Sequence, residues 1–578
     1  IGQHLPQQRG FLPPRAGGTH RVRHGDDPGH THSPTVPGGG GRGRRGFPKH
    51  RGGGILGIGD GGGLVRCGRL HVGAGCSSRG GLAALYFVAF LVAFNQFRAL
   101  LGTDGLLPPI PEFVQAVPFR RAPSLFHLRY SDRFFAAVAA AGGAVLAAAT
   151  VLGVADLLPL PLTMLVWFVL WALYLSIVNV GQVWYSFGWE SLLLEAGVLA
   201  MFLGNAETAP PFVMLILLRW LLFRLEFGGA GLIKMRGDRC WRDLTCLYYH
   251  HETQPMPGPL SWYFHHLPRP LHKVEVAGNH VTQLVVPFGL FAPQPVAGIA
   301  AAIMIVTQLW LVTSGNFSWL NWMAIILGGL SVIPDEGYRL VLPLGDPGGH
   351  EGAPAWFAAC VLALAVVVVV LSYQPVRNMA SGGKQKMNAS FNRWHFVNTY
   401  GAFGSVTRVR REVVVEGTAD TTLGPDTVWK EYEFKGKPGD LRRRPPRQFA
   451  PYHLRLDWLM WFAGISRDYA ADWFPPLMAK LLRNDEHVVK LLRYNPFPDT
   501  PPRYVRARLF RYRFTTRAQR RATGAWWVRT PIGEYFFSRP SLPTDEFSRA
   551  ARSVYPTMEN PRRGETDAQD HPRGCGST

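Results

Sequence analysis

Cysteine is scarce in this chain, which has six cysteines among 578 residues. That number excludes a small disulfide-rich scaffold, in which frequent cysteines compensate for a small hydrophobic core. No two cysteines have CxxC spacing and no HExxH motif occurs, so the commonest zinc-binding frameworks are absent. We therefore expect neither a metal ion nor another cofactor.

Charged residues are also few, at 17% of the chain, against roughly 25% in an average soluble protein. The shortage lies in the middle, because residues 81–373 contain 14 basic and 16 acidic residues, whereas residues 374–578 contain 35 and 20. Several runs in the middle block are almost free of charge and reach about 20 residues, the length that crosses a bilayer. This pattern excludes a soluble enzyme, a collagen and a wholly disordered chain as first interpretations.

Acidic residues are outnumbered 39 to 61 by lysine and arginine, which gives a net charge of +22. The excess lies in the two flanks. Positive charge beside membrane spans is typical of topology signals or of contact with anionic lipid. No zinc-finger, helix-turn-helix or ribonucleoprotein motif occurs. We expect the lipid bilayer as a partner, and no nucleic acid.

The two ends of the chain have the composition of disordered segments. Residues 1–80 contain 24 of the 64 glycines and 12 basic residues, and such a segment cannot bury a core. We expect a disordered Gly/Arg/Pro-rich extension there. A second interpretation is that this segment is not native. Residues 546–578 are expected to form a disordered tail.

The middle block, residues 81–373, is predicted to be an α-helical polytopic membrane bundle of about 8–9 transmembrane helices. One apolar run, residues 281–291, is short enough to be an interfacial or broken element instead. The basic residues of the loops do not settle the orientation. The nine candidate runs are residues 81–101, 136–152, 160–180, 189–203, 212–227, 281–291, 296–313, 319–333 and 355–373.

Charged residues that lie within or beside these runs include Glu190, Glu195, Arg219, Arg224 and Glu226. An ionisable group in a membrane span is a candidate for function, because leaving it in lipid is costly. The favoured alternative is an internal ion pair between helices. Glu195 is the expected partner of Arg219 or Arg224.

A polar segment, residues 228–280, separates two apolar runs and holds six histidines and many large aromatic residues. We expect an ordered surface at the membrane face, not a flexible spacer. Histidine pairs could bind a metal, but His250 and His251 are adjacent and do not face the same way on a helix. Cys240 and Cys246 could form a disulfide in an oxidising compartment or remain two buried thiols.

Several strings of this segment resemble the lipase maturation factor family: residues 237–246 (GDRCWRDLTC), 252–257 (ETQPMP) and 261–268 (SWYFHHLP). The resemblance covers about residues 81–545. Further similar strings are residues 102–108 (GTDGLLP), 186–195 (SFGWESLLLE), 315–321 (GNFSWLN), 398–404 (NTYGAFG), 429–432 (WKEY) and 494–497 (YNPF).

The resemblance implies a polytopic protein of the endoplasmic reticulum membrane, or of the plasma membrane if the source is bacterial. It implies a chaperone-like factor that assists folding and assembly of secreted lipases or other exported proteins, with no established catalytic residues. The segment's expected client-binding or structural residues are Trp241, Glu252, Gln254, Trp262, Tyr263, His265 and His266.

Two other functions are open at this stage. The membrane portion is distantly similar to vitamin K-dependent carboxylase, which implies an enzyme with Lys234 as base and His250 or His265 as partner. The alternative for Lys234 is a lysine whose stem packs while its amine reaches the membrane surface. A transporter would need a midplane cavity and a repeat, and we find no internal repeat.

The last block, residues 374–545, is expected to be a β-rich extramembrane domain. Alternation of Arg with apolar residues is clearest in residues 504–514. Other expected strands are residues 413–415, 429–434, 453–461 and 535–537, and residues 474–493 are expected to be helical.

Overall fold

The structure is a computed structural model of the chain, and it describes residues 72–332, 352–382, 385–446 and 451–537. The expected tail at 546–578 lies outside these residues, as does most of the expected disordered flank. Residues 72–80 of that flank, however, are helical, because they form the first turns of α2 (Val72–Leu100). We call residues 72–382 the helical bundle and residues 385–537 the C-terminal part.

Within the described residues, five helices are long and apolar enough to cross a membrane. They are α2 from Arg79 to Leu100, the continuous Asp132–Val151 (α4 Asp132–Phe134, π-helical η3 Phe135–Gly142 and α5 Gly143–Val151), α6 (Leu160–Val180), α14 (Val296–Ser314) and α17 (Ala355–Ala380). The expected count of eight or nine is not reached by this criterion and stays a prediction. The apolar helices α7 (Gly188–Ala200) and α15 (Leu320–Val332) have 13 residues each, fewer than the about 20 that a span needs.

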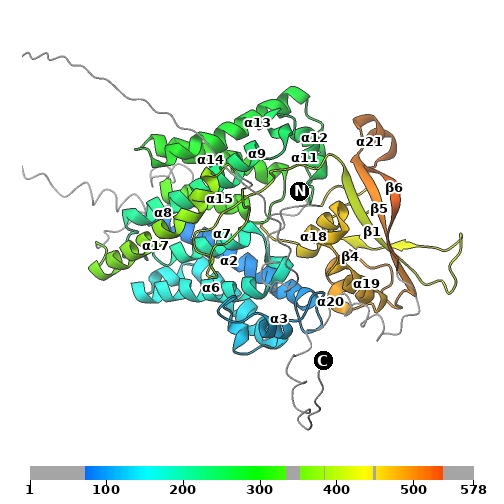
Figure 1. Ribbon diagram of the computed structural model, residues 1–578, viewed down its shortest axis with the longest axis horizontal. Coiled ribbons are helices and arrows are strands. Elements are labelled where there is room, and N and C mark those ends of the chain that lie inside the picture. The colour runs from blue at the N-terminus through cyan, green and yellow to red at the C-terminus, as the bar shows by residue number, and fades with distance from the viewer. Residues whose placement is uncertain (1–71, 333–351, 383–384, 447–450, 538–578) are drawn as a thin grey trace, which may run out of the picture.

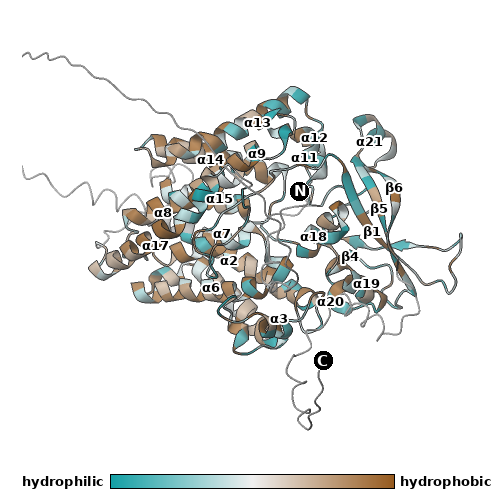
Figure 2. Cartoon of the chain, in the orientation of Figure 1, coloured by the Kyte–Doolittle hydropathy of each residue, from teal (hydrophilic) through white to brown (hydrophobic). Residues whose placement is uncertain are grey.

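The long helices run side by side in Figure 1, with α2 in contact with α5, α7 and α15. Figure 2 shows α8 (Phe212–Phe223), α14 and α17 as largely hydrophobic, whereas the strands carry many hydrophilic residues. Short helices complete the bundle: α3 (Ile110–Ala116), η2 (Leu125–His127), η4 (Val154–Leu157), η5 (Gln182–Tyr185) and η7 (Val286–Phe291).

The polar segment 228–280 is ordered, as expected, and it is mostly helical. α8 continues without a break through the π-helix η6 (Arg224–Leu232) into α9 (Ile233–Arg236). Three short helices and one long one follow: α10 (Arg239–Arg242), α11 (Leu247–Thr253), α12 (Ser261–His265) and α13 (Arg269–Leu284). The short apolar run at 281–291 is therefore not a span of its own, since it is divided between the end of α13 and η7.

The C-terminal part contains an antiparallel sheet in the order β2-β1-β5-β6. Its strands are β1 (Arg410–Thr418), β2 (Lys430–Glu431), β5 (Tyr504–Phe514) and β6 (Trp527–Phe537), and a second sheet pairs β3 (Glu433–Phe434) with β4 (Leu492–Tyr494). β5 has the bounds expected from its alternation, and it pairs along its length with β1 and β6.

Helices also form much of this part: α18 (Arg455–Ile465), η8 (Arg467–Tyr469), α19 (Phe474–Leu482), α20 (Glu486–Val489) and α21 (Arg517–Thr523). The expected strand at 453–461 is wrong, because these residues begin α18. Leu456, Leu459 and Ala463 recur with helical spacing and are buried, and α18 packs on β1. The expected helix at 474–493 is interrupted after α19, where Asn484 has a φ of 52°.

The two parts share one continuous hydrophobic core. The ring of Trp189 in α7 lies 5.0 Å from that of Trp458 in α18, and Trp184 lies 5.6 Å from Trp473. Gln96 in α2 donates to the carbonyl oxygen of His453 at 2.8 Å. The C-terminal part is therefore docked firmly on one end of the bundle.

Candidate functional site

A cavity of about 720 Å³ lies where the helical bundle meets the C-terminal part. Its walls come from η6, α13 and α14 of the bundle, from residues 400–405, and from α18. The lining is mostly apolar and aromatic, with polar side chains gathered in one group. A concave site of this composition is typical of ligand- or segment-binding sites.

The polar group is a hydrogen-bonded network around Glu226 and Lys234. Lys234 Nζ donates to Asn279 Oδ1 at 2.5 Å and to Gln283 Oε1 at 2.8 Å. Gln283 Nε2 donates to Glu226 Oε2 at 3.3 Å, and Gln308 also donates to this carboxylate. Lys234 Nζ further lies 4.8 Å from the centre of the Trp241 ring. The network joins η6, α9, α13 and α14 across the cavity.

Three glycines of η6 allow this close assembly. A Cβ on Gly229 would lie 2.8 Å from Cβ of Tyr400, and one on Gly231 would lie 2.9 Å from the carbonyl oxygen of Gln283. A Cβ on Gly228 would lie 2.6 Å from Sδ of Met379. The sequence Gly228-Gly229-Ala230-Gly231 therefore lets the helix touch α13, α17 and the 398–404 segment at once, and a π-helix often marks such functional positions.

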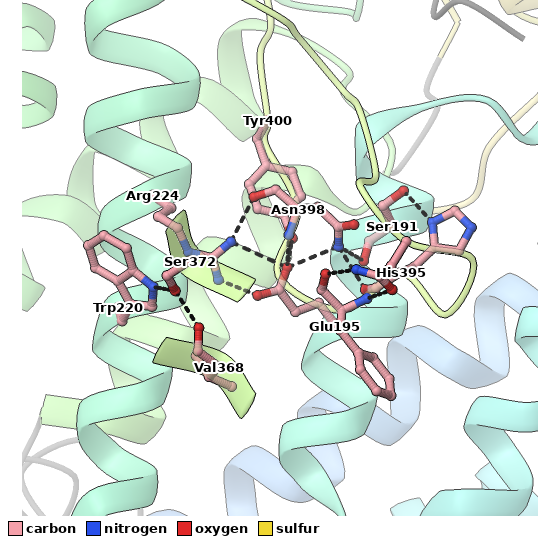
Figure 3. Close-up of polar contacts among 11 residues, drawn as sticks. Ser191, Glu195, Trp220, Arg224, Val368, Ser372, His395, Asn398 and Tyr400 are labelled. Carbon is pink, nitrogen blue, oxygen red and sulfur yellow. Dashed lines mark hydrogen bonds and ion pairs between the residues drawn. The ribbon is translucent and has the colours of Figure 1, made fainter. Parts of the chain in front are cut away.

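Beside the cavity, Glu195 of α7 is surrounded by donors, as Figure 3 shows. It forms a buried ion pair with Arg224 of η6. It also accepts from the backbone N–H of Asn398 at 2.9 Å and from the hydroxyl of Tyr400 at 2.6 Å. Arg224 Nη1 donates to the carbonyl oxygen of Asn398 at 2.7 Å. These bonds fix the 398–400 segment against the bundle.

The second glutamate of α7, Glu190, pairs with Arg455 at the start of α18. Arg455 Nη1 lies 2.7 Å from Glu190 Oε1 and donates to the carbonyl oxygen of Trp184 at 2.6 Å. The Tyr174 hydroxyl also donates to Glu190. Both partners are fully buried, so this pair links the two parts of the chain.

The sheet of the C-terminal part binds residues of the 228–280 segment through hydrogen bonds. The backbone N–H of Phe514 donates to Glu252 Oε2 at 2.8 Å, and Trp262 Nε1 donates to the carbonyl oxygen of Thr515 at 2.9 Å. Arg410 of β1 donates to the carbonyl oxygen of Glu252 at 2.9 Å. Burial raises the pKa of the Glu252 carboxyl. These contacts place α11 and α12 against the end of β5.

Two family descriptions match this chain. The lipase maturation factor transmembrane domain matches residues 78–339, and the lipase maturation factor C-terminal domain matches residues 396–537. Lipase maturation factor 1 of Homo sapiens is 42% identical over 506 residues, covering 80% of this chain and 87% of the human protein. The chain belongs to the lipase maturation factor family. No solved structure matches it.

Other members of the family match over a similar length. Lipase maturation factor 2 of Gallus gallus is 28% identical and covers 79% of this chain and 80% of its own length. Lipase maturation factor 1 of Bos taurus is 42% identical, covering 79% of this chain and 87% of the relative. The resemblance inferred from the sequence strings is therefore confirmed over both the bundle and the C-terminal part.

The structure places Cys240 and Cys246 at disulfide-bonding distance, with their Cα atoms 4.8 Å apart. The pair joins α10 to the start of α11 and packs with Trp241 and Val276 in a small buried cluster. Trp241 Nε1 donates to the carbonyl oxygen of Phe403 at 2.8 Å. The two cysteines are thus close enough for the bonded alternative, which stays a prediction.

The expected client-binding or structural residues of the segment lie at different depths. Trp241, Gln254 and Trp262 are buried, and Gln254 donates to Ser261 Oγ at 2.9 Å. His265 and His266 are partly buried. Tyr263 is exposed and lies beside Trp526. Only Tyr263 among the seven is thus placed to meet a partner without rearrangement.

Lys234 and His250 both line the cavity, and His265 does not. The side chain of Lys234 points to the polar network, so the interpretation that it reaches the membrane surface does not fit. The relatives named above are lipase maturation factors and none is a carboxylase.

Arg219 is not joined to Glu195. Its guanidinium donates to the carbonyl oxygens of Ser331 at 2.9 Å and Leu290 at 3.1 Å. Gln283, Gln308 and Arg455 were not among the residues expected from the sequence. Their partners lie 57, 82 and 265 positions away, so no local spacing could have identified them. The available signal was the set of family strings, because those at 186–195, 315–321 and 398–404 all supply residues to the cavity wall.

Proposed function

We propose that this chain is a chaperone-like membrane factor that assists the folding and assembly of secreted lipases. The observation that carries the proposal is its 42% identity to human lipase maturation factor 1 over 80% of the chain. The family's transmembrane and C-terminal domains match residues 78–339 and 396–537, which hold most of the bundle and of the C-terminal part. A carboxylase-like activity is not part of the proposal, because its support was a short similarity around Lys234.

The proposed location is the endoplasmic reticulum membrane, with the disulfide and the C-terminal part on the lumenal side. A disulfide persists in an oxidising compartment and is rare in the cytosol. We further propose that α7, α15 and the continuous α8–α9 helix enter the bilayer, which with the five long helices makes eight membrane elements. α8–α9 runs from Phe212 to Arg236. Four of its charged side chains, Arg219, Arg224, Glu226 and Lys234, are buried inside the protein, where an intramembrane charge can be paired, and Arg236 at its end is exposed.

The proposed contact with a folding client is an exposed cluster of aromatic and arginine side chains at the end of the sheet. Tyr263 is 43% exposed, and neighbouring Leu260 is 40% exposed. Arg520 Cζ lies 3.5 Å from the centre of the Trp526 ring and 5.6 Å from that of Tyr263. Tyrosine, tryptophan and arginine are the residues most enriched in energetically important protein contacts.

The test uses cells that lack lipase maturation factor and express a secreted dimeric lipase. We expect the full chain to restore secreted lipase activity per mass of lipase. We expect Tyr263→Ala to lower that restoration several-fold at equal expression, whereas Tyr494→Ala, which removes another exposed tyrosine, should not. Full-length protein that is folded and correctly located, yet restores no activity, would overturn the proposal.

Membrane sidedness has its own test in sealed microsomes. A membrane-impermeant thiol reagent should label Cys240 and Cys246 only after the membrane is opened and the disulfide is reduced. Labelling of intact vesicles without reduction would place the segment in the cytosol, where a contact with secreted lipases is not feasible.

A further inference from the structure

Three potential metal ligands meet between α11 and α13. His251 comes from α11, and His272 and Glu275 come from α13. One ligand atom from each of the three lies within 4.8 Å of the others. His272 and Glu275 are three residues apart on one helix, so they share a face, and α11 packs against that helix.

Both ring nitrogens of His251 are buried and available for a ligand. It is 1% exposed, and neither of its ring nitrogens has a hydrogen-bond partner among the residues that the structure describes. The centre of its ring lies 5.5 Å from that of Phe264 and 5.6 Å from that of His272. A buried polar group without a partner costs about 1–3 kcal/mol, so the fold keeps this imidazole at a cost that a bound ion would remove.

His272 and Glu275 also have side-chain atoms available to bind an ion. His272 is 2% exposed, and its Nδ1 lies 3.9 Å from Glu275 Oε2, too far for a hydrogen bond. The second oxygen of Glu275 accepts from Trp310 Nε1 at 2.7 Å. Such a bond from an outer residue orients a metal-binding carboxylate.

We propose that His251, His272 and Glu275 form a binding site for a divalent transition metal, with Zn²⁺ as the best match. Imidazole nitrogen and carboxylate oxygen are zinc ligands at about 2.0–2.2 Å, which puts tetrahedral ligands about 3.4 Å from each other. The three atoms must therefore approach one another by up to about 1.4 Å when the ion binds. Two histidines and one carboxylate leave the fourth position open for water or another ligand.

The site would fasten α11 to α13, both of which adjoin the cavity. Glu275 and Trp310 themselves line that cavity, so the ion would set the position of one wall. No metal was expected from the sequence for two reasons: the common zinc motifs are missing, and the adjacent His250 and His251 do not face the same way on a helix. This site uses neither motif, so its ligands come together only in the fold. Only His251 of the adjacent pair is used, and its partners lie more than 20 positions away.

The test is the metal content of the full chain, purified in detergent, equilibrated with buffered Zn²⁺ and measured by mass spectrometry. We expect about one zinc per chain in the wild type, and a loss of at least five-fold in His251→Ala. His487→Ala is the control, because His487 is partly exposed beside Glu486 and is not in the site. Wild-type protein without zinc, or His251→Ala with the full amount, would overturn the proposal.

A second variant guards against misfolding. Glu275→Gln keeps the side-chain shape but removes the charge, and it should weaken zinc binding by 10–100-fold while the protein elutes as one folded species. Co²⁺ substitution gives an independent measurement, since a tetrahedral site with nitrogen and oxygen ligands produces visible absorption in the wild type and not in His251→Ala. Absence of that absorption in metal-loaded wild type would contradict the proposed ligand set.

Discussion

At the scale of single residues, the buried charges decide how the chain is held together. Glu195 is only 4% exposed, yet five donor atoms of Arg224, Asn398 and Tyr400 point at its carboxylate. Removing a charge from water costs several kcal/mol, and an ion pair with further hydrogen bonds offsets that cost. Losing one partner leaves the other charged and buried.

Arg224→Met should therefore destabilise the protein by about 3–5 kcal/mol. The loss should appear as a lower thermal unfolding midpoint in detergent. The double variant Glu195→Gln/Arg224→Met should recover part of the loss, because neither buried charge remains. Arg239→Met is the control, since that side chain is 82% exposed. Equal midpoints for Arg224→Met and the wild type would contradict this account.

His453 makes stability depend on pH. It is buried among the rings of Phe187, Trp189 and Trp458, and this burial, with a smaller effect of Arg455, lowers its pKa well below 6.5. The unfolded chain takes up a proton on His453 below pH about 6.5 and the folded chain does not. Its contribution to stability is thus present above that pH and is lost as the pH falls, by about 1.4 kcal/mol per pH unit.

His453→Phe should flatten the dependence, because a phenyl ring fills the same aromatic site without titrating. The measurement is the unfolding midpoint of both proteins between pH 7.5 and 5. We expect the wild-type midpoint to fall faster than that of the variant. Parallel curves would show that His453 does not supply the effect.

At the scale of elements, the glycines of η6 allow the close packing that forms one wall of the cavity. Gly229→Ala would place a Cβ 2.8 Å from the Tyr400 Cβ, so the helix or the 398–404 segment must move. We expect a loss of about 1–3 kcal/mol. Gly278→Ala in α13 is the matched control, because nothing lies within 4 Å of its new Cβ, and there alanine should be neutral or stabilising by about 0.5–1 kcal/mol.

The disulfide stabilises the short helices α10 and α11, which follow η6 and α9 in the chain. Removing the bridge with Cys240→Ala/Cys246→Ala should lower stability by about 2 kcal/mol, the entropy gained by a short loop in the unfolded chain. The unfolding midpoint of the wild type in reducing agent should fall by the same amount. Cys360→Ala is the control, because Cys360 is unpaired and exposed. A reducing agent without effect on the wild type would contradict the bridge.

The sequence predicts an element well when neighbouring residues determine it, and poorly when contacts with distant parts of the chain determine it. The strand at 504–514 could be predicted because one of its faces is buried, and the alternation of apolar and basic residues along the strand shows this directly. The prediction of a strand at 453–461 was wrong because a short run of Trp, Leu and Phe is compatible with either a strand or a helix. The packing of α18 on β1 decides for the helix. Glu195 and Arg224 could be paired from adjacent helices, whereas the pairing of Glu190 with Arg455 depends on docking between parts.

At the scale of the whole molecule, the Glu190–Arg455 pair connects the membrane bundle to the C-terminal part. Arg455 Cζ lies 3.5 Å from the centre of the Tyr185 ring, and its guanidinium bonds Glu190 and the carbonyl oxygen of Trp184. α18 also supplies Trp458 and Trp461 to the cavity wall. The cavity exists in this form only while the two parts are docked.

Arg455→Met should loosen that docking while the sheet survives, because the register of β5 with β1 and β6 does not involve Arg455. Hydrogen exchange should quicken in α7 and α18, and the amides of β5 should stay protected. Arg483→Met, at an exposed position, should leave all three unchanged. A uniform rise in exchange would mean that the pair supports the global fold instead. Since the cavity needs both walls, the loosened variant should also restore less lipase activity than Arg483→Met at equal expression.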